Sequence, residues 1–124
     1  MQCTSQQIAN VVLIRVEGRI DHTTAPDFGQ ALTAHLDGCS GEEHKLLLDC
    51  SGVDYMSSAG LRVLSTAAKR CRAQQGEMVL AALQPMIQEV FKISRFDKVF
   101  KIFPTVKAAL EALSPSAAVA YDGI

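Results

Sequence analysis

The segment SGVDYMSSAGLRVL, residues 51–64, joins two stretches whose hydrophobic patterns differ. Before it, residues 45–50 (KLLLDC) have an unbroken apolar centre, which is typical of an interior parallel strand buried on both faces. After it, apolar residues recur with a helical period, which predicts a helix from about residue 58 to 73. Two small hydroxyl residues, Ser57 and Ser58, are therefore expected where a buried strand passes into a helix.

The rest of the chain alternates strand-like and helix-like segments. Residues 11–17 predict a strand that pairs with the preceding residues through a tight turn near Ala9 and Asn10, and Gly18 either ends this strand or bends it. Further strands are expected at 78–83 and 101–103, and helices after Thr24, Gln84 and Thr105. This order predicts an α/β fold, a single domain with a mixed β-sheet and about four packed helices. We expect the domain to span residues 1–113 and residues 114–124 to form a mobile tail.

Composition excludes several classes of function. The 124 residues fit one domain, and 12 basic against 13 acidic residues argue against duplex DNA or an anionic membrane as partner. No apolar run approaches the ~18 residues of a membrane span, and the first residues lack the features of a signal peptide. Four cysteines without a C-x-x-C pair indicate a cytoplasmic protein with reduced thiols. The spacing of His35, Cys39 and His44 matches no zinc motif, so we expect no metal.

The junction around Ser58 allows three chemical interpretations. A nucleophilic serine requires G-x-S-x-G, and a phosphate-binding loop requires G-x-x-x-x-G-K-[ST]; both patterns are absent. A serine that is itself phosphorylated suits a helix start, because the helix dipole favours negative charge there. The structural alternative is that Ser57 simply caps the helix, a role that contributes ~1 kcal/mol.

The segment LLLDCSGVDYMSSAGLRVL resembles the signature of STAS domains, in particular of stand-alone bacterial anti-sigma factor antagonists. The resemblance extends over roughly residues 6–113 and includes VEGRID, MVLAAL and FKISRFDKVFKIFPTVKAAL. In many members the turn is Asp-Ser-Ser-Gly-Leu or Asp-Ser-Thr-Gly-Leu, and its first hydroxyl residue is phosphorylated. By position, Ser57 replaces the aspartate and Ser58 takes the place of the phosphoserine, with Ser57 as the alternative acceptor.

The resemblance implies a regulatory binding protein of transcription without catalytic activity or cofactor. When unphosphorylated, such a protein binds an anti-sigma factor or related switch serine kinase and frees that protein's other client. The kinase phosphorylates the serine and the complex dissociates, and a serine phosphatase reverses the step. The resemblance places these residues on the partner surface: Asp21, His22, Thr23, Met56, Ser57, Ser58, Gly60, Arg62 and Ser65.

Other interpretations remain open from the sequence. STAS domains also serve as subunits of lipid-transport complexes and as parts of anion transporters, roles that need no phosphorylation. A small enzyme is a third class. Asp21 is equally well explained as a turn residue, and Met56 and Leu61 as core residues.

Overall fold

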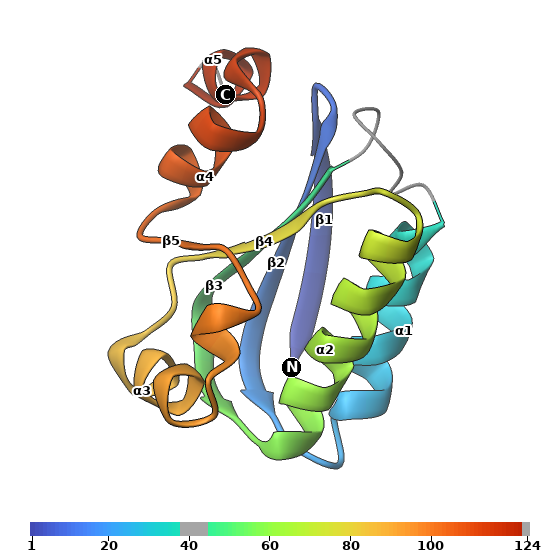
Figure 1. The fold of residues 1–124 in the computed structure, drawn as a ribbon, viewed down its shortest axis with the longest axis vertical. Coiled ribbons are helices and arrows are strands. Elements are labelled where there is room, and N and C mark those ends of the chain that lie inside the picture. The colour runs from blue at the N-terminus through green and yellow to red at the C-terminus, as the bar shows by residue number, and fades with distance from the viewer. Residues whose placement is uncertain (38–44, 123–124) are drawn as a thin grey trace.

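A five-stranded sheet forms the centre of the protein, and the computed structural model describes residues 1–37 and 45–122 (Figure 1). The strands lie across the sheet in chain order and are β1 (Gln2–Ile8), β2 (Val11–Ile20), β3 (Lys45–Met56), β4 (Met78–Ala81) and β5 (Ile102–Phe103). β1 pairs antiparallel with β2, while the later neighbours pair in parallel. The predicted α/β fold with a mixed sheet is confirmed, and so is the turn at Ala9 and Asn10.

Helices cover both faces of this sheet. On one face lie α1 (Ala25–Leu36), α2 (Ser58–Ala73) and α3 (Pro85–Ile93), and α3 is followed by a 3-10 helix at Phe96–Lys98. On the other face lie α4 (Val106–Leu113) and α5 (Pro115–Asp122). Figure 1 shows α1 and α2 running side by side in the same direction, so that their N-termini meet at one end of the molecule. The predicted bounds of α2 are confirmed.

The strand β3 is buried on both faces, as its apolar run predicts. Leu46 and Leu48 belong to the core under α1 and α2, whereas Leu47 belongs to the core under α4 and α5. All three side chains have no exposed surface. Because neighbouring residues of a strand point to opposite faces, only a two-sided core can bury such an unbroken run.

Both β2 and β3 extend beyond their predicted ends. Gly18 does not end β2; it has a φ of +100° and lies at a register shift between β2 and β3, after which pairing continues to Ile20 and Met56. The extra residue of this β-bulge is Asp54 on β3, and Gly18 on the opposite strand adopts a positive φ, which glycine does without steric cost. The bulge therefore carries both strands as far as the loops that lead into α1 and α2.

The C-terminal segment, which we expected to form a tail, contains a helix. Residues 115–122 form the helix α5, in which Ala117 and Ala118 are buried against α4 and the sheet. The hydrophobic pattern of the sequence does not predict this helix. Its buried residues are alanines, so no stripe of large apolar side chains marks the face that packs on the sheet. Lys45 anchors the connection, since its buried Nζ donates a hydrogen bond of 2.8 Å to the carbonyl oxygen of Leu113 at the end of α4.

Packing of α5 predicts slow amide hydrogen exchange. The amide of Ala118 donates to the carbonyl of Ser114 over 3.1 Å, and that of Ala117 donates to the Ser114 hydroxyl over 3.3 Å. We expect both amides to exchange at least ten-fold more slowly than those of an unstructured peptide, as measured by NMR. Exchange at the unstructured rate would instead support a mobile tail.

The C-terminus of α2 predicts a stabilising substitution. Gln75 follows α2 with a φ of +61°, and the next amide, that of Gly76, donates to the Cys71 carbonyl. Glycine tolerates this left-handed conformation better than glutamine. Gln75→Gly should raise the free energy of unfolding by about 0.5–1 kcal/mol in urea titrations. Lys69→Gly, inside the helix, should lower it by about 1 kcal/mol; the same sign for both variants would contradict the explanation.

Candidate functional site

The loops at the carboxyl ends of β2 and β3 lie together beside the starts of α1 and α2 (Figure 1). They are joined directly, because the amide of Ser57 donates to the carbonyl oxygen of Ile20 over 2.9 Å. In open α/β sheets, the carboxyl ends of parallel strands are the usual place for a functional site. The predicted site residues from both loops therefore come together at one end of the molecule.

The two serines of the junction differ in exposure. Ser58 is the first residue of α2, and its side chain is exposed. Ser57 occupies the N-cap position, and its carbonyl accepts a hydrogen bond of 3.1 Å from the Leu61 amide. Its hydroxyl oxygen, however, is buried and makes no hydrogen bond to the residues that the structure describes. The prediction that the Ser57 side chain caps the helix is therefore wrong, although the backbone position is correct.

Gly60 and Met56 are packed between the start of α2 and the sheet, away from solvent. Both are buried, and Met56 is only 4% exposed. A Cβ atom on Gly60 would lie 2.7 Å from Cγ2 of Ile20 and 2.9 Å from Cγ of Met56. Only a glycine allows the first turn of α2 to pack this closely on the ends of β2 and β3. Both residues therefore lie in the core of this structure, as Leu61 does, and their contact with a partner stays a prediction.

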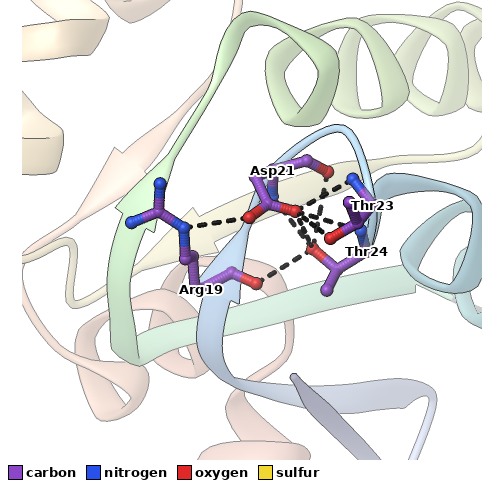
Figure 2. Close-up of polar contacts among 4 residues, drawn as sticks. All are labelled: Arg19, Asp21, Thr23 and Thr24. Atoms are coloured by element: carbon purple, nitrogen blue, oxygen red, sulfur yellow. Dashed lines mark hydrogen bonds and ion pairs between the residues drawn. The ribbon is translucent and has the colours of Figure 1, made fainter.

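Asp21 organises the loop between β2 and α1 (Figure 2). Its Oδ1 accepts hydrogen bonds of 2.6 Å from the Thr23 hydroxyl and 2.9 Å from the Thr23 amide, and its Oδ2 accepts one of 2.9 Å from Nε of Arg19. The Thr23 hydroxyl and then Arg19 hold the pKa of the Asp21 carboxyl well below its usual range. Asp21 is thus an ionised turn residue whose side chain orders its own loop.

Thr24 completes this loop in a way that the sequence does not predict. It precedes α1 at the N-cap position, but its side chain makes no capping hydrogen bond. Its hydroxyl instead donates to the carbonyl of Arg19 and accepts from the amide of Asp21, each over 2.9 Å (Figure 2). The Thr24 hydroxyl therefore closes the turn and does not cap α1.

Arg19 connects this loop to the end of β3. Its guanidinium carbon lies 3.8 Å from the centre of the Tyr55 ring, a cation–π contact between paired residues of β2 and β3. Sequence reasoning missed both residues because it ended the two strands at residues 17 and 50, before Arg19 and Tyr55. Pairing of Arg19 with Tyr55 across the two strands could have indicated the contact. That pairing follows the register shift at Gly18, which the sequence does not show.

The remaining predicted residues lie around these loops. His22 and Thr23 are exposed at the start of α1, and Arg62 is exposed one turn into α2. Ser65 is half-buried one turn further along α2. His22 and Thr23 precede α1, and Arg62 and Ser65 follow Ser58 along α2, so they lie on the two elements whose N-termini meet at this end of the molecule.

In residues 1–37 and 45–122, no three His, Cys, Asp or Glu side chains are grouped so that they could hold a metal. His35 lies in α1, while Cys39 and His44 lie outside the described residues. Across the described chain, none of the helices combines the length and the apolar character needed to cross a bilayer.

Comparisons with known proteins agree with this geometry. The sequence model of the STAS domain matches residues 2–109. BtrV of Bordetella bronchiseptica, named as a candidate anti-sigma factor antagonist, is 36% identical over 90% of this chain and 94% of its own length. The anti-sigma-B factor antagonist of Listeria monocytogenes is 35% identical over 72% of this chain and 75% of its own.

Solved structures share the fold at lower sequence identity. The unphosphorylated form of the anti-sigma factor antagonist SpoIIAA superposes with a TM-score of 0.74 at 16% identity, over 90% of this chain and 96% of that one. The phosphorylated form of SpoIIAA from Bacillus gives a TM-score of 0.68, also at 16% identity, over 91% and 100%. With a family match over nearly the whole chain and relatives above 30% identity, the chain belongs to the STAS domain family and, within it, to the anti-sigma factor antagonists.

Proposed function

We propose that this protein binds an anti-sigma factor that is also a switch serine kinase, and that phosphorylation of Ser58 releases it. The observation that carries the proposal is the exposed Ser58 hydroxyl at the first residue of α2, at the turn of the family signature. A serine phosphatase would restore the binding form. We place this cycle of binding, phosphorylation and dephosphorylation in the cytoplasm, in agreement with the free thiols of Cys3, Cys50 and Cys71.

The acceptor is Ser58 because a kinase must reach the hydroxyl that it modifies. The Ser57 hydroxyl oxygen is buried, so its modification would require the start of α2 to open. Ser58 needs no such change, because its side chain already faces solvent. A phosphate at this first helical position also meets the positive end of the helix dipole, which tolerates an anion.

The same phosphate would be costly within a protein interface. Phosphorylation adds about −1.5 to −2 charges, which partner binding would have to desolvate. A buried charge left without a partner costs ~2–5 kcal/mol. At 1.4 kcal/mol for each factor of ten, this lowers the affinity by roughly 30-fold to several thousand-fold.

The proposed partner face surrounds Ser58. It includes the loop before α1 with Asp21, His22 and Thr23, and Arg62 and Ser65 of α2. The rigid hydrogen-bond network of Asp21 and the cation–π contact of Arg19 hold this loop in place, which lowers the entropy lost on binding. Its role is binding without catalysis, since the nucleophile and phosphate-loop motifs are absent from the sequence.

The switch predicts distinct behaviour for two variants of Ser58. Incubation with the cognate kinase and ATP should add one phosphate, located on Ser58 by mass spectrometry. Ser58→Ala should abolish labelling and keep partner affinity within about three-fold, because it removes only a hydroxyl. Ser58→Asp should weaken binding less than the phosphate does, since one carboxylate carries less charge.

Calorimetry with the partner isolated by pull-down from source cells measures these affinities. Ser5→Ala is the matched control, because it removes an exposed serine hydroxyl on β1, outside the proposed partner face, and should remain a substrate. Equal affinity of phosphorylated and unphosphorylated protein would refute the switch. It would favour a constitutive subunit of a transport complex instead.

Burial of the Ser57 hydroxyl yields a separate prediction on stability. An N-cap serine normally loses about 1 kcal/mol when replaced by alanine. Here the hydroxyl makes no hydrogen bond to the described residues, so Ser57→Ala should leave the free energy of unfolding unchanged or raise it by up to ~1 kcal/mol. Thr105→Ala is the control, because the Thr105 hydroxyl accepts from the Ala108 amide over 3.0 Å and its loss should cost about 1 kcal/mol. Urea titration compares the two variants, and an equal loss for both would contradict the assignment.

A further inference from the structure

Arg62 lies one helical turn beyond Ser58 in α2, and both side chains are exposed. Residues four apart in a helix are neighbours, with their Cβ atoms about 5–6 Å apart. The Cα–Cβ bonds of a helix tilt toward its N-terminus, so a long side chain at position 62 covers the preceding turn. The guanidinium of Arg62 can therefore reach the surroundings of the Ser58 hydroxyl without any change in the backbone.

The surroundings of Arg62 leave its charge available. No ion pair joins it to another residue within the described ranges 1–37 and 45–122. It borders a groove between α1 and α2, where the residues of α1 that face it carry no charge: Pro26, Gly29, Gln30, Leu32, Thr33 and Leu36. The other charged residue of this groove is Arg70, which already pairs with Asp37. The groove thus supplies no carboxylate that would compete for Arg62.

We propose that Arg62 is the intramolecular counter-ion of the phosphate on Ser58. An acidic group four residues before a basic one is the favourable order in a helix, because it also suits the helix dipole. Guanidinium and phosphate form two parallel hydrogen bonds of matching geometry, which a lysine cannot reproduce. This inference rests on the proposed phosphorylation of Ser58, and it identifies Arg62 as the residue that binds the new phosphate.

The pair changes the partner face in two ways at once. Before phosphorylation, the first two turns of α2 present the neutral Ser58 and the free cation of Arg62. After phosphorylation, they present an anion, and Arg62 is occupied by it. A partner that offers a carboxylate to Arg62 would therefore lose that contact and meet a phosphate at the same place, which explains release without a change of fold.

A thermodynamic cycle tests the pair without any kinase. Phosphoserine is incorporated genetically at position 58 of the full chain, in the background of Arg62 and of Arg62→Gln. Urea titrations of the four proteins then give the effect of the phosphate on the equilibrium constant of unfolding. We expect phosphorylation to be about two- to five-fold more favourable to the folded state with Arg62 than with glutamine, the range of an exposed ion pair.

Two further variants sharpen the cycle. Arg72→Gln removes an exposed arginine near the far end of the same helix and should leave the effect of the phosphate unchanged. Arg62→Lys should retain part of the coupling, because it keeps the charge but loses the paired hydrogen bonds. A cycle that is additive within a factor of 1.3, or a coupling that Arg72→Gln abolishes equally, would overturn the proposal.

Partner binding separates this proposal from the proposed function. Calorimetry with the isolated partner should show that Arg62→Gln weakens binding of the unphosphorylated protein by about three- to ten-fold. The same change should weaken binding of the phosphorylated protein by less than two-fold, because Arg62 is then already occupied. If phosphorylation lowers affinity but the unfolding cycle is additive, the switch stands and the counter-ion is wrong. If the cycle shows coupling but phosphorylation leaves affinity unchanged, the ion pair stands and the proposed function fails.

Discussion

The close contact of Gly60 with Ile20 and Met56 determines where α2 begins and hence where Ser58 lies. There is no space for a side chain at residue 60, since a Cβ atom would approach both neighbours to under 3 Å. The two neighbours are themselves fixed, because they are paired at the ends of β2 and β3 and buried in the core. Ser58, the proposed acceptor, is thus carried on a helix start that packs directly on the ends of two buried strands, and a loop of its own is not needed to present it.

The loop before α1 is fixed to the same framework by polar contacts. The ionised Asp21 binds Thr23 and Arg19, and Arg19 in turn packs on Tyr55 of the neighbouring strand. Together with the backbone hydrogen bond from Ser57 to Ile20, these contacts make the two loops one surface. Such a surface has little freedom left to lose when a partner binds, so binding energy is not spent on ordering it.

Much of this arrangement follows from the sequence, and the exceptions have physical causes. The apolar run of Leu46, Leu47 and Leu48 predicts a central strand because only a core on both faces can bury it. Helix α5 escaped prediction because alanines form its buried positions. The burial of Met56 and Gly60 was not evident because a signature motif places residues along the chain without stating which of them face the core. The start of α2 at Ser58 was predicted, but the burial of the Ser57 hydroxyl was not, because it depends on how the ends of β2 and β3 pack against the helix.

A rigid site suits a switch that acts by charge. In the free protein, a phosphate on Ser58 lies in water at the positive end of the α2 dipole, where an anion is stabilised by typically 0.3–1 kcal/mol. In a complex, the same phosphate must lose its water, and an unpaired buried charge there costs ~2–5 kcal/mol. In the proposed switch, this difference between the two environments lowers the affinity without any rearrangement of the antagonist. A flexible loop would weaken this effect, because it could move the phosphate out of the interface, whereas Ser58 belongs to a helix whose first turn packs closely on Ile20 and Met56 through Gly60.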